Sequence, residues 1–161
     1  MATPTNLPGT QTTGNLLSAA YLNDLRGSFR VLQVVQATST TTTSTASTTY
    51  VDTTLTANIT PQSTSSKILI IPSHSVYAFT ASTGGGLRIV RNSTVLQTHA
   101  DVAFNTGGSS VIQWSTLLLD SPATTSTLTY KTQQNRSVGT GTFFTQVNSN
   151  FASLTLMEIS A

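Results

Sequence analysis

The chain has 161 residues, of which 7% are charged and 37% hydrophobic, and its formal net charge at pH 7 is +2. A typical globular domain carries about 25% charged residues, so charge repulsion contributes little to solubility and we expect the chain to bury its strand edges, for example by assembly. The basic residues are scattered along the chain, which argues against nucleic-acid binding. The absence of cysteine excludes disulfides and thiolate metal sites. No apolar run approaches the roughly 20 residues that span a bilayer.

The first 27 residues are predicted to form an extended arm that contains one short helix. Residues 1–14 are rich in Thr, Pro, Asn and Gly, which break regular elements. In Asn15–Gly27, the apolar residues Leu17, Tyr21 and Leu25 recur at a spacing of four and share one helix face. A helix of about ten residues is marginal in water, so it needs a surface on this chain or on a neighbouring molecule. The apolar contact candidates in the arm are Leu16, Leu17, Tyr21, Leu22 and Leu25. A disordered tail is the alternative.

Two strands joined by a polar turn organise the second predicted region, residues 28–161. In the first strand, Thr48–Ile59, apolar residues alternate with threonines, which places one face on a core. Pro61–Ser66 has the proline and hydroxyl side chains of a turn. The second strand, Lys67–Ile71, is apolar at four successive positions. Such a run is typical of a strand covered on both faces, at a sandwich centre or a subunit interface.

Further strands precede and follow this pair. A strand is expected over Phe29–Gln36, and the low-complexity segment Ala37–Ser47 favours an exposed edge hairpin. The later strands are expected at Leu87–Val90, Val95–His99, Val111–Leu119, Leu128–Gln133, Thr142–Val147 and Phe151–Ile159. Glycines predict loops at Gly84–Gly86 and Asp101–Ser109. The pattern predicts an all-β fold, a jelly-roll-like antiparallel β-sandwich. An immunoglobulin-like sandwich is the nearest alternative, but no Cys–Trp–Cys spacing supports it.

Few residues have the chemistry of a catalytic or metal site. His74, His99 and Asp101 are the one conceivable acid–base or metal set, and His74 joins the other two only if the fold happens to bring it there. A metal site usually needs three protein ligands with second-shell support. We therefore expect structural histidines, no catalytic residue, no metal and no cofactor. Four aromatic residues could stack on a sugar ring but are more typical of a core or an interface: Tyr77, Phe104, Tyr130 and Phe144.

The run Val31–Ile71 combines a VLQVV strand, a threonine-rich stretch, the sequence TYVDTTLTANITP and a serine turn into SKILI. This combination resembles a module of virion proteins from tailed bacteriophages, including those that infect cyanobacteria and other aquatic bacteria. Leu87–Leu96, LRIVRNSTVL, is similar to the module's next hairpin, and the resemblance covers roughly Phe29–Ser160. NLLSAAYLNDL in the arm also resembles segments that precede such modules in phage structural proteins.

The resemblance implies a structural virion protein, usually a homotrimer, with no catalytic residue. The first expectation is a trimeric capsid cement (decoration) protein on the outer head surface, whose arm clamps neighbouring major capsid proteins. Without a signal peptide, we expect synthesis in the host cytoplasm. The alternative is a receptor-binding adhesin module of a tail fibre, with a host-surface glycan as partner; a chain of this size that starts at methionine leaves little room for a fibre shaft. A soluble enzyme or lectin unrelated to phages is more distant. The trimer-interface candidates, taken from apolar runs, are Ile68, Ile70, Leu117 and Leu119.

Overall fold

The structure is a computed structural model that describes residues 31–108 and 110–160. The predicted arm, residues 1–27, and its helix at Asn15–Gly27 lie outside the described residues. The arm, its five contact candidates and the domain boundary at residue 27 therefore stay predictions.

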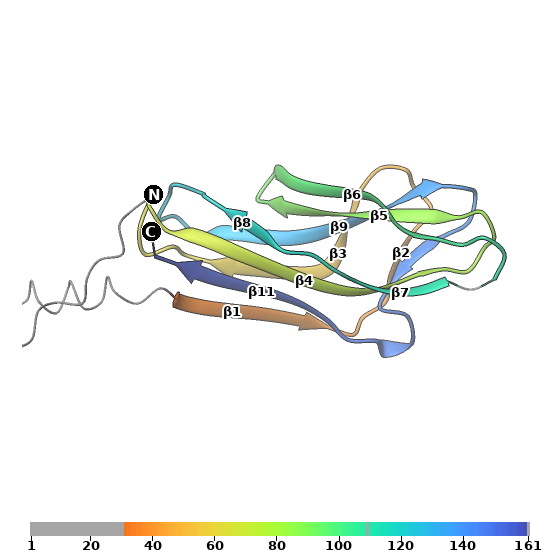
Figure 1. Ribbon diagram of the computed structural model, residues 1–161, viewed down its shortest axis with the longest axis horizontal. Coiled ribbons are helices and arrows are strands. Elements are labelled where there is room, and N and C mark those ends of the chain that lie inside the picture. The colour runs from red at the N-terminus through yellow and green to blue at the C-terminus, as the bar shows by residue number, and fades with distance from the viewer. Residues whose placement is uncertain (1–30, 109, 161) are drawn as a thin grey trace, which may run out of the picture.

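The described part of the chain consists of strands with one short 3₁₀ helix (Figure 1), and paired strands run antiparallel. The elements are β1 (Val31–Ser39), β2 (Thr43–Thr45), β3 (Val51–Ile59), β4 (Lys67–Ala78), β5 (Gly84–Arg91), β6 (Thr94–Phe104), β7 (Ser110–Ser115), β8 (Leu118–Asp120), β9 (Leu128–Val138), β10 (Phe143–Thr145), η1 (Val147–Ser149) and β11 (Ala152–Ile159). The predicted all-β class is confirmed.

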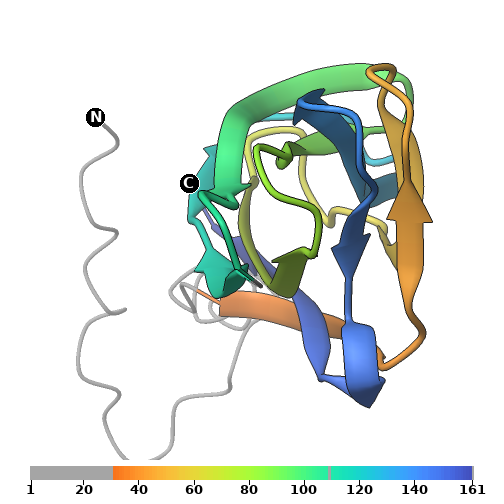
Figure 2. The same cartoon turned by 90° about the vertical axis from the view of Figure 1, so that its right-hand side faces the viewer.

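The strands form two sheets that enclose a common interior, as the view along the strands shows (Figure 2). Sheet A has β11 between β1 and β4, with β7 and β8 also paired to β4, and it continues through β10 to β2. Sheet B has the order β3-β9-β5-β6. When β7 and β8 are counted as one interrupted strand, the two four-stranded orders are β1-β11-β4-β7/β8 and β3-β9-β5-β6. This is the arrangement of a jelly roll, in which most consecutive strands cross between the sheets, with β5 and β6 as neighbours in one sheet.

β4 is the central strand of sheet A, and both of its edges are paired by interrupted strands. β11 and β10 follow one another along one edge, and β8 and β7 along the other. β4 was expected to end at Ile71, but it continues through Pro72. Proline has no N–H to donate to a neighbouring strand, and the Pro72 carbonyl accepts a hydrogen bond of 3.0 Å from the Ser115 hydroxyl at the end of β7. The predicted single strand Val111–Leu119 is therefore two strands, and the break lies opposite Pro72.

The predicted loop at Gly84–Gly86 is wrong, because these glycines are buried at the start of β5. A Cβ atom on Gly85 would lie 2.1 Å from Cγ of Phe143, so the Phe143 ring occupies the space that a side chain would need. A glycine within a strand often marks such a close approach. The predicted loop at Asp101–Ser109 is also shorter than expected, because β6 extends to Phe104.

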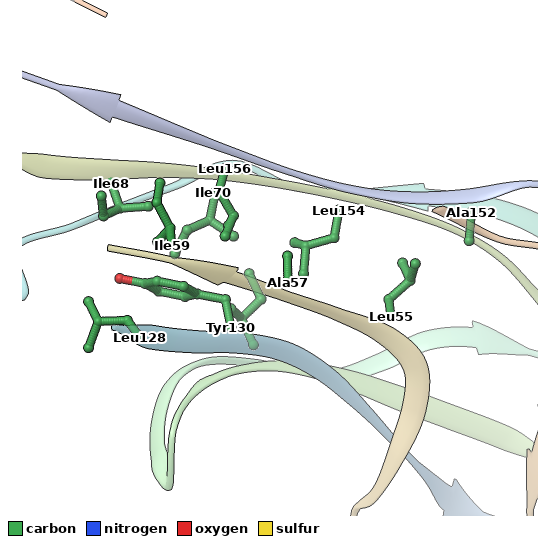
Figure 3. Close-up of a cluster of buried hydrophobic side chains, with 11 residues drawn as sticks. Leu55, Ala57, Ile59, Ile68, Ile70, Leu128, Tyr130, Ala152, Leu154 and Leu156 are labelled. Carbon is green, nitrogen blue, oxygen red and sulfur yellow. The ribbon is translucent and has the colours of Figure 1, made fainter. Parts of the chain in front are cut away.

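The interior contains two apolar clusters at different positions along the strands. Cluster 1 joins β3 and β9 of sheet B to β4 and β11 of sheet A, with their side chains pointing toward one another (Figure 3). Its buried members are Leu55, Ala57, Ile59, Ile68, Ile70, Ile89, Leu128, Tyr130, Ala152, Leu154 and Leu156. Cluster 2 consists of Val76, Ala78, Leu87, Ala103, Trp114 and Phe143.

Candidate interaction surface

Sheet A exposes an apolar row across four strands on its outer face. Side chains alternate between the two faces of a strand, so the neighbours of the buried residues of cluster 1 point outward. The strand register places these outward residues opposite one another: Val34 opposite Met157, Met157 opposite Leu69, and Leu69 opposite Leu119. Val34 is 56% exposed and Leu119 48%, while the two central side chains are half-buried. We call Val34, Met157, Leu69 and Leu119 the apolar row.

The outer face of sheet A has a second apolar region at the opposite end of β4. Tyr77 is paired with Phe144 on one side and Val111 on the other. The Phe79 ring lies 5.9 Å from that of Tyr77 and 5.3 Å from that of Phe144, and Phe79 is 47% exposed. The Tyr77 hydroxyl accepts a hydrogen bond from the Asn150 side chain. Three aromatic rings therefore gather at this end of the face.

A polar but uncharged band separates the two apolar regions. The Gln113 amide donates to the Ser73 hydroxyl at 2.7 Å, and the Ser75 hydroxyl donates to the Gln113 carbonyl oxygen at 3.1 Å. Among the described charged residues, only Lys67 is exposed on the outward side of sheet A. The outer face of sheet A is therefore neutral from end to end, apart from this residue at the start of β4.

The outer face of sheet B has the opposite character, because charged and amide side chains form a network there. Asp52 accepts hydrogen bonds from Lys131 at 2.8 Å and from Gln133 at 2.5 Å, and Gln133 accepts one from Arg88 at 2.7 Å. The Arg88 guanidinium also lies 4.3 Å from the centre of the Tyr50 ring. Partial burial acts to raise the pKa of Asp52, but its bonds to Lys131 and Gln133 outweigh burial and the pKa is lowered.

Two interior carboxylates connect elements at the end of the sandwich that contains cluster 1. Asp120 of β8 accepts hydrogen bonds from Arg91 at 2.7 and 2.8 Å and from the Tyr130 hydroxyl at 2.7 Å, which joins sheet A to sheet B. Burial and this bond to Asp120 raise the pKa of Tyr130. Glu158 is buried and accepts bonds from the Gln33 amide at 2.5 Å and the Gln62 N–H at 2.7 Å. Burial acts to raise the pKa of Glu158, but hydrogen bonding lowers it overall.

A buried polar layer lies between the two apolar clusters. His74 Nδ1 accepts a hydrogen bond of 2.6 Å from the Gln146 amide, so its Nε2–H donates to the Thr132 hydroxyl at 2.9 Å. Thr132 bonds in turn to Thr53 at 2.6 Å. Burial lowers the pKa of His74 to about 4, although the bond to Gln146 acts to raise it. Gln134 belongs to the same layer, but neither atom of its buried amide group has a hydrogen-bond partner.

The rings of both histidines lie near that of Trp114, His99 at 5.3 Å and His74 at 6.1 Å, whereas Asp101 is exposed. Among the described residues, no three His, Cys, Asp or Glu side chains form a group that could hold a metal ion. His74 is fully buried, so it is closed to a substrate from solvent.

The structure separates the four predicted trimer-interface residues. Ile68 and Ile70 are fully buried in cluster 1, so they have no surface to offer a partner, and their assignment to an interface needs correction. Side chains of β4 point alternately to the two faces of the sheet, and those of Ile68 and Ile70 point inward. Four successive apolar residues do not reveal which two of them point inward. Leu117 is 62% exposed and Leu119 48%. Sequence reasoning missed Val34, Leu69 and Met157, although apolar residues on both faces of β1 and β11 were the signal that could have identified them.

The aromatic residues considered for sugar binding are also separated. Tyr130 is buried in cluster 1, and Phe104 is 46% exposed on β6 of sheet B. Tyr77 and Phe144 are adjacent on sheet A, with the exposed ring of Phe79 beside them. Only this second group brings several rings together.

Comparison with known proteins gives similarities of fold alone. No family model and no curated protein matches the chain. Among solved structures, T=1 particles derived from infectious bursal virus align at 13% identity with a TM-score of 0.45, covering 80% of this chain and 36% of that one. The VP2 subviral particle of infectious bursal disease virus aligns at 13% identity with a TM-score of 0.41, covering 80% of this chain and 37% of that one. Latent PorU from Porphyromonas gingivalis aligns at 10% identity with a TM-score of 0.37, covering 82% of this chain and 13% of that one. The chain thus spans little more than a third of the viral chains.

The described residues contain no helix that combines the length and apolar character needed to cross a membrane.

Proposed function

We propose that this chain is a structural protein of a tailed-phage virion, a trimeric cement protein that clamps neighbouring major capsid proteins on the outer head surface. The observation that carries the proposal is the outer face of sheet A on a jelly-roll sandwich, which has an apolar region at each end and Lys67 as its one exposed charge among the described residues. An exposed apolar patch of this kind marks an interaction site. The sequence resemblance over Phe29–Ser160 supports the virion as the place of that interaction.

In this proposal the arm attaches the protein to the capsid. Its apolar candidates, Leu16, Leu17, Tyr21, Leu22 and Leu25, would each contribute about 1.5–3 kcal/mol on burial. Ordering the arm costs about 1–2 kcal/mol per residue in backbone entropy. One arm therefore binds weakly, and three arms of a trimer gain affinity through effective concentration.

Deletion of residues 1–27 tests the attachment. The truncated protein should fold and self-associate like the full chain, but fail to decorate capsids that lack the native protein. A control deletion of residues 1–14 keeps the apolar helix and should retain most of the binding. Unchanged decoration by the protein lacking residues 1–27 would show that the sandwich itself is the anchor.

A receptor-binding module of a tail fibre is the second candidate, and the exposed Phe79 ring beside Phe144 favours it. Tyr77 of the same group is only 5% exposed, so Phe79 is the ring that could stack on a sugar, with a host-surface glycan as the partner. Copy number in purified particles distinguishes the two functions. A cement protein should approach the abundance of the major capsid protein by quantitative mass spectrometry, whereas a fibre protein should be far less abundant.

A further inference from the structure

We propose that the outer face of sheet A is the surface through which copies of this chain associate, with a second copy of the chain as its occupant. This inference rests on the self-assembly in the proposed function and assigns that assembly to one face. The apolar row lies near one end of this face, where Val34, Met157, Leu69 and Leu119 come from four adjacent strands and are aligned by the strand register.

The distribution of charge favours a second copy as the occupant. Charged side chains that a partner covers lose their contact with water, which costs free energy unless each finds a partner charge or hydrogen bond. A second copy on the outer face of sheet B would cover the charged network of Arg88, Lys131 and Asp52. The outer face of sheet A presents only Lys67 among the described charged residues, at the start of β4 and two residues from Leu69. Self-association through sheet A thus avoids most of this cost.

The size of the face also suits a pair of copies. β4 has 12 residues, which at about 3.3 Å per residue is roughly 40 Å, and four strands about 4.8 Å apart span roughly 19 Å. The face therefore covers roughly 750 Å², close to the 800 Å² or so that each partner buries in a standard interface.

The row is also partly ordered before any partner binds. Met157 and Leu69 are half-buried between the strands on either side, so they lose little conformational freedom when a partner covers them. The most exposed members, Val34 and Leu119, lie on the two outer strands of the row. Lysine substitutions there should disrupt association while leaving the interior packing unchanged.

The test compares matched lysine pairs on the two faces of the full-length protein. Val34→Lys with Leu119→Lys alters the sheet A face. Val95→Lys with Val138→Lys alters strands of sheet B, where both valines are 44% exposed. Light scattering and sedimentation equilibrium measure association, and circular dichroism confirms folding. The unaltered protein should exceed the 16.9 kDa mass of one chain, and two copies that pair through this face alone should give twice that mass. The sheet A pair should raise the dissociation constant by about 100-fold or more, and the sheet B pair by no more than about threefold.

Each other outcome has a stated meaning. If the Val34→Lys, Leu119→Lys variant keeps the mass of the unaltered protein, or if the unaltered protein is a monomer at micromolar concentration, the inference is overturned. If this variant keeps that mass but no longer decorates capsids, the face contacts the capsid instead, and the inference is likewise overturned while the virion role stands. If copies associate through this face but the protein is absent from particles, the virion role fails and the inference stands. Should the lysine pair not fold, Val34→Thr with Leu119→Thr should still weaken association measurably.

Discussion

The two parts of the sandwich interior are built from the same strands but differ in chemistry. In cluster 1, β4 contributes Ile68 and Ile70 and β9 contributes Leu128 and Tyr130. Further along, β4 contributes His74 and β9 contributes Thr132 and Gln134, all buried. The alternation of side chains is unbroken across this change. Strand pairing thus tolerates a polar interior, whereas apolar burial, the main stabilising contribution, is concentrated in cluster 1.

The largest effect is expected from removing apolar volume in cluster 1. Leu156 is fully buried between the sheets, so Leu156→Ala loses burial and leaves a cavity, lowering the free energy of unfolding by about 2–5 kcal/mol. Urea denaturation followed by circular dichroism measures the change. Val95→Ala, at a position 44% exposed, is the control and should change stability by no more than about 0.5 kcal/mol. Equal effects of the two substitutions would contradict the assignment of stability to cluster 1.

Acid should weaken the polar layer before it affects the rest of the interior. The pKa of His74 is about 4 when folded, against an ordinary value of 6.5, so the unfolded chain binds its proton more readily. Stability is therefore constant above about pH 6.5 and falls as the pH drops toward 4, by at most about 3 kcal/mol. His74→Gln should lose this dependence in the same window. The carboxylates with lowered pKa, Asp52 and Glu158, act at lower pH. Stability that is independent of pH between 6.5 and 4.5 would count against a neutral, buried His74.

The smallest expected effect is a gain in stability at Gln134. Its buried amide has no hydrogen-bond partner, and an unsatisfied buried polar group costs about 1–3 kcal/mol. Gln134→Met keeps the length of the side chain without the amide, so thermal unfolding should show stabilisation by about 1 kcal/mol. Thr132→Val is the matched control. It removes a hydroxyl that bonds to His74, and should destabilise by a similar amount. A destabilised Gln134→Met protein would show that its amide is satisfied after all.

The fold class and most strands could be predicted because their signals are local. Alternating residues such as Leu55, Ala57 and Ile59 identify a strand with one buried face. The break between β7 and β8 was not predictable in this way, because it depends on Pro72 in a strand distant in sequence. The same is true of Gly85, whose place in a strand depends on the ring of Phe143.

The candidate surface was only partly predictable for a related reason. The run Ile68–Ile71 showed that both faces of one strand are apolar, but not which residues point outward. The apolar row becomes visible only when the register of four strands is known, since Val34, Leu69, Leu119 and Met157 come from separate segments. The polar layer likewise draws His74, Thr132 and Gln146 from three strands or turns.

The pairing of β1 with β11 has a consequence for how the molecule forms. Gln36 and Thr155 are 119 positions apart in the chain, yet their side chains are hydrogen-bonded across this ladder. Proteins dominated by such distant contacts fold in milliseconds to seconds, because loop closure precedes any stabilising contact. At about 5–20 residues per second, the ribosome takes several seconds to deliver β11 after β1. During that interval β1 has no partner strand, and sheet A can be completed only after nearly all of the sandwich has been synthesised.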